Sequence, residues 1–180
     1  MKKIVIYIII VLFIPNVCFA KNILDNSRKI SFETSNQWYI SSLGEDPLTH
    51  ELITIVYNND TFIRFTQSNY RMKYKNLKQA TDEEINELRD YMIRYYINVL
   101  KAKGYTFFVN KTDCFQNSIV IGATIKNDKT IGRMISVTYI KDYIGYIVVA
   151  ICTDESANET LNTLSTLRIE GVRIDDWMQQ

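Results

Sequence analysis

The chain has 180 residues, of which 47% are hydrophobic and 12% aromatic, and its 21 Lys and Arg residues balance 20 Asp and Glu residues. These values exclude an intrinsically disordered chain. The near-zero net charge gives no long-range attraction to nucleic acid or to an anionic membrane. Because only two prolines occur, Pro15 and Pro47, and no repeat interrupts the sequence, it indicates a single domain.

The first twenty residues have the pattern of a secretory signal peptide. Lys2 and Lys3 form a short basic start, an apolar run covers residues 4–14, and Pro15 ends this run shortly before a small residue, Ala20. We therefore expect cleavage after Ala20. The product is predicted to be exported, periplasmic or extracellular, with no membrane span once the leader is removed.

Two other fates of the leader stay open. The apolar run is shorter than the roughly 20 residues of a transmembrane helix, but it could be retained as an anchor. Lipid attachment at Cys18 is the second alternative, although Val17 stands where a lipobox usually has Gly, Ala or Ser. With the leader as residues 1–20, residues 21–180 are predicted to form one domain that ends in a tail from about residue 169.

Short β-rich runs fill the first part of this domain. After a polar lead-in, residues 30–32 and 38–40 each predict a short strand. Residues 52–57 and 61–65 lie on either side of an Asn-Asn-Asp sequence, which predicts a β-hairpin with a short turn.

A helix over residues 82–103 has the clearest signals in the chain. Thr81 and Glu84 have the spacing of a capping box, and Gly104 follows the last turn as a C′ residue. Apolar residues recur every three or four positions and predict one buried face, made of Ile85, Leu88, Met92, Tyr95, Tyr96 and Val99.

Four further β-rich runs follow, at residues 105–109, 118–125, 130–141 and 143–153. Their short connections predict an antiparallel meander. Alternating residues from Ile131 to Tyr139 predict a strand with one buried face, whereas the continuous apolar run 147–152 predicts a central strand covered on both faces.

A second helix is predicted from about residue 155 to Leu167, with an apolar stripe of Ala157, Leu161, Leu164 and Leu167. Together these elements predict an α+β fold. An antiparallel β-sheet, made of the hairpin and the C-terminal meander, would be packed by one long and one shorter α-helix.

Two cysteines remain after leader cleavage, Cys114 and Cys152, and an exported protein can pair them. In the predicted meander Cys152 lies level with Ala123, two strands away. Cys114 lies about 30 Å further along, whereas a disulfide needs Cα atoms within about 7 Å. Unless residues 110–117 double back, we expect two unpaired cysteines and no Cys114–Cys152 disulfide.

The sequence carries no pattern typical of catalysis or metal binding. His50 is the single histidine and stands in a loop after Pro47, and the acidic residues that follow Thr81 fit a helix start. We therefore expect a protein that is not an enzyme, with no catalytic residue, no metal and no cofactor. A hydrolase that uses His50 or Asp113 is the remaining enzymatic alternative.

One basic and aromatic segment lies between the hairpin and the long helix. Its candidate partner-binding residues are Arg71, Lys73, Tyr74, Lys75 and Lys78. Interleaved basic and aromatic residues can hold single-stranded nucleic acid, but an exported protein without net charge does not favour that ligand. An anionic lipid, a glycan or an acidic protein partner fits the predicted compartment better, and a solvated loop is the alternative.

A ligand pocket between the sheet and the long helix is a second hypothesis. Aromatic residues from both elements would line it, namely Tyr91, Tyr95, Phe107 and Tyr146. Such a pocket would suit a small molecule or a lipid.

The arrangement resembles the PsbP-like α/β sandwich of DcrB-like small exported bacterial proteins. The resemblance covers most of residues 30–168 and rests on the first two short strands, the hairpin, the helix 82–103, the meander and the helix that contains residues 161–167. The segment before Trp38 departs from the family pattern because it lacks Pro and Gly. The resemblance implies a non-catalytic accessory or binding domain, with no active site to transfer.

These observations favour an exported, non-catalytic accessory or protein-interaction domain, whose partner would be an unknown envelope or extracellular protein. The alternative is a small-molecule or lipid-binding protein. The sequence leaves the oligomeric state open, and long apolar strands allow dimerisation through a sheet edge.

Overall fold

The computed structural model of the chain describes residues 21–25, 30–34, 38–45, 52–68, 71–114, 118–169 and 171–173. The predicted signal peptide, with Cys18, lies outside the described residues, as do His50 and the tail beyond Arg173. Within the described part, no helix has the length and apolar character needed to cross a membrane.

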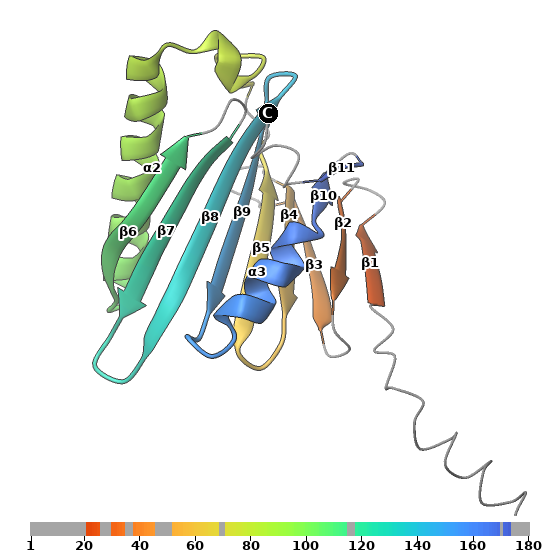
Figure 1. The fold of residues 1–180 in the computed structure, drawn as a ribbon, viewed down its shortest axis with the longest axis vertical. Coiled ribbons are helices and arrows are strands. Elements are labelled where there is room, and N and C mark those ends of the chain that lie inside the picture. Colours follow the sequence, from red (N-terminus) through yellow and green to blue (C-terminus); the bar gives the residue numbers. More distant parts are fainter. Residues whose placement is uncertain are drawn as a thin grey trace, which may run out of the picture.

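A seven-stranded antiparallel sheet forms the centre of the fold (Figure 1). Its order across the sheet is β3 (Tyr39–Glu45), β4 (Leu52–Tyr57), β5 (Thr61–Gln67), β9 (Ile144–Cys152), β8 (Ile131–Lys141), β7 (Ser118–Lys126) and β6 (Thr106–Cys114). The predicted hairpin is confirmed as β4 and β5, and the predicted meander as β6 to β9. The apolar run 147–152 lies in β9, which is central as expected.

A second, four-stranded sheet was not predicted. It has the order β1 (Lys21–Asp25), β2 (Ile30–Thr34), β10 (Arg168–Ile169) and β11 (Val172–Arg173). The strand expected at 30–32 is confirmed as β2, but the polar lead-in also forms a strand, and so does the start of the expected tail. Two-residue strands leave no periodic signal in a sequence, and β10 is held by pairing with β2 from the other end of the chain.

The long helix α2 (Asp82–Ala102) begins and ends where the sequence predicts. Both hydrogen bonds of the capping box form between Thr81 and Glu84, and Gly104 has a positive φ of 80° after the last turn. The second helix is α3 (Ala157–Ser165), and a 3₁₀ turn, η1 (Leu77–Gln79), precedes α2.

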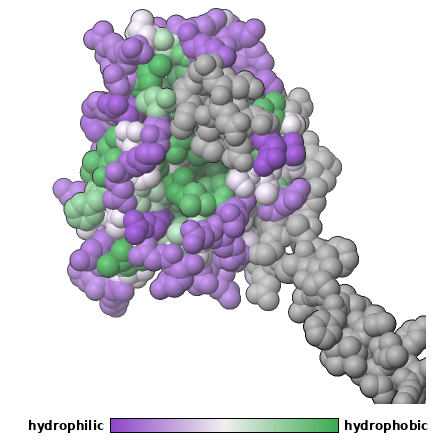
Figure 2. Space-filling model, in the orientation of Figure 1, coloured by the Kyte–Doolittle hydropathy of each residue, from purple (hydrophilic) through white to green (hydrophobic). Residues whose placement is uncertain are grey.

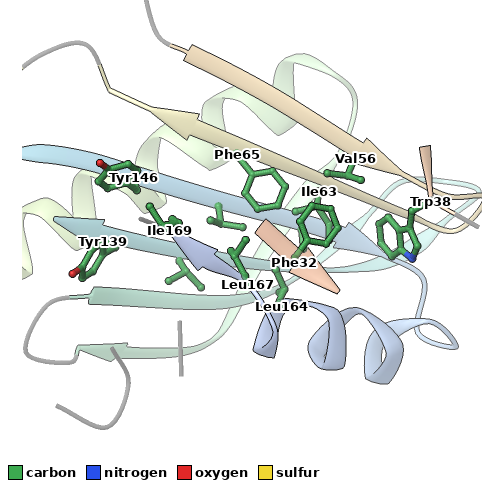
Figure 3. Packing of buried hydrophobic residues seen from close by; sticks show 13 residues of the cluster. Phe32, Trp38, Val56, Ile63, Phe65, Tyr139, Tyr146, Leu164, Leu167 and Ile169 are labelled. Carbon is green, nitrogen blue, oxygen red and sulfur yellow. The ribbon is translucent and has the colours of Figure 1, made fainter. Parts of the chain in front are cut away.

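Each face of the seven-stranded sheet is covered by a different layer. On one face, called here the α2 face, Ile119, Ile121 and Met134 pack with Met92 and Tyr96 of α2. On the opposite face, called the α3 face, the buried cluster joins the central strands to α3 and the small sheet (Figure 3). In that cluster Phe32 of β2 stacks on Phe65 of β5, with 5.6 Å between ring centroids.

Strand β8 corrects one expectation. Val137 and Tyr139 are buried on the α3 face as predicted, but Met134 and Ile140 are buried on the α2 face. Both faces are covered because α2 lies over the residues that the alternation assigned to solvent. Two buried hydrogen bonds also join β8 to this helix. Thr138 donates to the sulfur of Met92, and the hydroxyls of Ser136 and Tyr96 are hydrogen-bonded to each other.

The buried stripes of both helices also differ from prediction. In α2 the buried residues are Met92, Tyr96 and Leu100, whereas Tyr95 is half exposed. In α3 they are Thr160, Thr163 and Leu164, whereas Leu161 is 49% exposed. Each helix therefore buries fewer residues of its predicted apolar stripe against the sheet than the sequence implied.

Cys114 and Cys152 are both free in this structure. Strand β6 is longer than predicted and runs back beside β7, so that Cys114 lies opposite Ile119. Cys152, at the end of β9, lies opposite Arg133 of β8. Three strand spacings of about 4.8 Å therefore separate the strands that carry the two thiols, which is too far for a disulfide.

Candidate functional site

An open groove of about 510 Å³ lies on the α3 face, between the first half of α3 and strands β6, β7 and β8. Its lining includes Asn110, Gly122, Arg133, Ile135, Asp154 and Leu161. Helix α3 packs chiefly on β9 and β2. Figure 1 shows α3 in front of the middle of the sheet, whereas β6 and β7 have no helix in front of them on this side.

Alternation along β7 explains the floor of the groove. Ile119, Ile121 and Ala123 face α2, so the intervening Val120 and Gly122 lie on the α3 face, where Gly122 lines the groove. A Cβ atom placed on Gly122 would meet only the carbonyl oxygen of Lys111, at 3.9 Å. The floor is therefore hollow because this strand position lacks a side chain, and not because the backbone needs glycine there.

Apolar side chains line the walls of this hollow. Ile135 of β8 is half-buried beside Gly122, with which it is paired in register, and Leu161 projects from α3. Figure 2 shows hydrophobic surface gathered in a hollow on this side of the molecule, with hydrophilic surface around it.

The rim of the groove is polar, and its charges are paired within the chain. Arg133 Nε donates to Asp154 Oδ1 at 2.5 Å, and these are the two charged residues that line the groove. Asn110 Nδ2 donates to Thr124 Oγ1 at 2.9 Å. The rim therefore presents hydrogen-bonding groups without a net charge.

The groove presents apolar side chains and one ion pair, Arg133 with Asp154. Across the described ranges, no three His, Cys, Asp or Glu side chains gather as potential metal ligands. Cys152 lies at the end of β9, next to the groove strand β8, but burial raises the pKa of its thiol above the ordinary value. A protonated, buried thiol is a poor nucleophile.

The basic segment is placed against the β8–β9 turn and the start of α2. Lys73 forms an ion pair with Glu84, and Lys75 Nζ lies 3.7 Å from Asp142 Oδ1. The Arg71 guanidinium lies 4.2 Å from the ring centroid of Tyr143. Each of these cations therefore has a partner inside the chain.

Backbone hydrogen bonds fix the same segment to the turn. Met72 N donates to Tyr143 O at 2.7 Å, and Tyr143 N donates to Lys75 O at 3.3 Å. Tyr74 lies beside Lys73, whose ammonium is 5.2 Å from the ring centroid. Lys78, which belongs to η1, makes no ion pair with the part of the chain that the structure describes. The segment as placed here anchors a turn and does not present a group of free cations.

The four aromatic residues of the predicted pocket do not come together. Phe107 packs against Tyr96 on the α2 face, with 6.2 Å between ring centroids, whereas Tyr146 is buried on the α3 face beside Tyr139. Tyr91 and Tyr95 are exposed on α2. The space between α2 and the sheet is filled by a packed core.

Sequence reasoning missed the groove residues Gly122, Ile135 and Leu161. One signal was present, because a glycine inside a strand pattern marks a position where a partner or ligand can approach closely. The other two look like ordinary core positions in a strand and a helix. Only the three-dimensional arrangement leaves them accessible.

Comparison with known proteins identifies the fold. No protein-family model and no curated protein matches the sequence. Among solved structures, the chain is similar to cyanobacterial PsbP (CyanoP) from Synechocystis sp. PCC 6803, with a TM-score of 0.59 and 9% identity over 86% of this chain and 96% of that chain. A protein from Bacteroides thetaiotaomicron matches with a TM-score of 0.47 and 13% identity, over 83% of this chain and 48% of that one.

The similarity to cyanobacterial PsbP confirms the PsbP-like resemblance at the level of the fold. At 9% identity it transfers no residue roles.

Proposed function

We propose that this chain is an exported, non-catalytic accessory domain that binds a protein partner through the groove on its α3 face. The observation that supports this proposal best is the groove itself, which has an apolar floor and a polar rim. Protein interfaces have the same organisation, with an apolar centre and polar surroundings. An apolar side chain of the partner would enter the hollow above Gly122, between Ile135 and Leu161.

The charges of the rim favour a protein partner over a charged small molecule. Arg133 and Asp154 already neutralise each other, so an ionic ligand would have to compete with this pair. The groove is also open to solvent, whereas small-molecule sites usually bury most of the ligand surface. A partner that brings a large surface of its own can cover the hollow and exclude water from it.

Small-molecule or lipid binding remains a second candidate function because of the size of the groove. Its volume of about 510 Å³ falls within the roughly 300–1,000 Å³ of typical ligand sites. A ligand there would contact Gly122, Ile135 and Leu161, not the aromatic residues that the sequence suggested.

A photo-crosslinking experiment in the native host tests the protein-binding proposal. A photoreactive side chain at Leu161 should give an adduct that is absent when the same group replaces Tyr91, which is exposed on α2. The cross-linked protein is identified by mass spectrometry and purified, and its affinity for the full mature domain is then measured. Gly122→Leu should weaken this affinity roughly tenfold or more, because the new side chain fills the hollow.

Tyr91→Leu is the matched control, since it also changes one exposed position to leucine but leaves the groove intact. Unchanged affinity of the Gly122→Leu variant would overturn the proposal. Native mass spectrometry of the gently purified protein gives the second arm. A bound small molecule that Gly122→Leu displaces would assign the groove to the alternative function instead.

Export rests on the leader and needs its own test. N-terminal sequencing of the protein from its native host should find Lys21 as the first residue, in the periplasm or the medium. Met1 retained on a cytosolic product would contradict export while leaving the binding proposal intact.

A further inference from the structure

Strand β6 forms one edge of the seven-stranded sheet in the described part of the chain. Its inner side pairs with β7, and its outer backbone groups face away from the sheet. Large apolar side chains are exposed on both faces of this strand, Phe108 on the α3 face and Val109 on the α2 face. An edge of this kind can accept another strand, unless charges or bulges prevent pairing.

Both kinds of protection are present on β6, and they restrict which strand can bind. A bulge between Val109 and Lys111 breaks the regular register. Beyond it, Lys111 and Asp113 lie on the same face of the strand, with 2.8 Å between their charged groups, and their side chains are 75% and 35% exposed. A partner strand that lacks opposite charges at the positions facing Lys111 and Asp113 would form no favourable cross-strand pairs with them.

We propose that the strand that fits this edge is β6 of a second copy of this chain, paired antiparallel about a twofold axis at Thr112. In this register Lys111 lies opposite Asp113 of the second copy, and Asp113 lies opposite Lys111 of the second copy. Thr112 faces its own equivalent. The sequence Lys-Thr-Asp is therefore complementary to itself when it is read in the opposite direction.

Charge complementarity is the observation that selects a second copy. Opposite charges and Thr–Thr pairs at directly opposed positions both stabilise antiparallel strands. An isologous contact uses the same patch on both subunits, so one self-complementary tripeptide supplies two ion pairs and one hydroxyl pair. The interface is short because the bulge at Asn110 limits regular pairing about the twofold axis to Lys111 through Asp113 of each copy. A weak, concentration-dependent dimer is therefore expected.

Charge-swapped variants of the mature domain test the register. In Lys111→Asp all four opposed groups are carboxylates, and in Asp113→Lys all four are ammonium groups. Each variant alone should dimerise roughly tenfold more weakly than wild type. An equimolar mixture should recover dimers, because the acidic variant then faces the basic one. Sedimentation velocity over a concentration series measures all four samples, in a Cys114→Ser background that removes unrelated thiol chemistry.

A second measurement locates the twofold axis. Thr112→Cys in the same background would place two thiols on directly opposed residues, with Cα atoms about 4.5–5.5 Å apart. Oxidised glutathione should convert this variant to a disulfide-linked dimer, taking up the two electrons and two protons that the thiols lose. Thr106→Cys is the matched control, since its two copies would be offset by about 40 Å along the strands.

Three results would overturn the proposal. These are a wild-type domain that stays monomeric at its highest soluble concentration, a charge-swapped mixture that does not recover dimers, and equal cross-linking of the Thr112→Cys and Thr106→Cys variants. Neither Lys111 nor Asp113 lines the groove, so the charge-swapped variants leave the groove residues unchanged. Failure of the dimer is therefore distinguishable from failure of the groove as a partner-binding site.

Discussion

The two faces of the seven-stranded sheet are closed in different ways. The α2 face is covered by a single long helix that begins at its capping box and ends at Ala102, close in sequence to strand β6, which it contacts. The α3 face is covered by a short helix and by a small sheet built from both ends of the described chain. One cover is local in sequence, and the other is assembled from distant segments.

The difference accounts for where the candidate site lies. The core under α2 is a packed cluster of buried side chains from the helix and the strands, because one amphipathic element matches the surface beneath it. On the α3 face, β10 and α3 reach β2 and β9 but leave β6 and β7 open. The groove is the part of the sheet that the assembled cover does not reach.

The largest expected effect comes from Leu167, which is fully buried and ties α3 and β10 to the central sheet. Leu167→Ala should lower the free energy of unfolding by about 2–5 kcal/mol, as should Ile121→Ala on the α2 face. Native-state hydrogen exchange should separate the two variants. Leu167→Ala should deprotect β2 and α3 well before the central strands open, whereas Ile121→Ala should lower protection throughout. Identical exchange patterns would show that the assembled cover is not a separate unit.

Two glycines on neighbouring strands give the next contrast. A Cβ on Gly132 would lie 2.9 Å from the carbonyl oxygen of Cys152, which is backbone and cannot move aside. Gly132→Ala should therefore destabilise the domain by about 1–3 kcal/mol in urea unfolding. Gly122→Ala enters the open groove and should be neutral or stabilising by up to about 1 kcal/mol. A comparable loss in both variants would mean that the groove floor is already filled.

Local signals explain why much of the fold is predictable. The Thr81 and Glu84 capping box, the Asn58 turn and the apolar run of β9 each specify an element from a few neighbouring residues. In the turn, Asn58 Oδ1 accepts from the backbone N–H of Asp60 and of Thr61, so even the turn type depends on local chemistry. These elements form the α2 face and the sheet itself.

The remaining features depend on contacts between distant residues. Arg168 of the two-residue strand β10 lies opposite Ser31 of β2, and no periodicity in the sequence near Arg168 predicts this pairing. Leu161 belongs to a regular apolar stripe, yet it is half exposed because it lies at the open groove and not against the buried cluster. Lys73 and Lys75 read as a free basic patch, although Glu84 and Asp142 neutralise them in the folded chain. The sequence of the basic segment alone does not show that these acidic partners will lie beside it after folding.

A buried hydroxyl pair offers a smaller test of the α2 cover. Tyr96 and Ser136 share a hydrogen bond of 2.6 Å, and Tyr96→Phe should cost about 1–3 kcal/mol because the Ser136 hydroxyl stays buried without it. Burial raises the pKa of Tyr96 from 10 to about 12. The stability that this group contributes is therefore present below pH 10 and is lost as the pH rises toward 12. Tyr95→Phe, at the exposed neighbour, should leave both the stability and its alkaline dependence unchanged.

The smallest expected effect concerns the start of α2, where the local cover begins. The hydrogen bond from Lys73, followed by the one from the backbone N–H of Thr81, lowers the pKa of Glu84 from 4.5 to about 2. A carboxyl group with a lowered folded-state pKa stabilises the fold above its unfolded pKa and loses this contribution as the pH falls. The loss should therefore occur between pH 4.5 and pH 2, and Glu84→Gln should flatten this part of the stability profile in urea titrations. The effect should also shrink at high salt, because both side chains are accessible to solvent.

Glu83→Gln, one residue earlier in the same turn, is the control that keeps the capping box. If the wild-type and Glu84→Gln profiles run parallel through this window, the capping box is not closed in solution, and the α2 cover depends on its packing against the sheet alone.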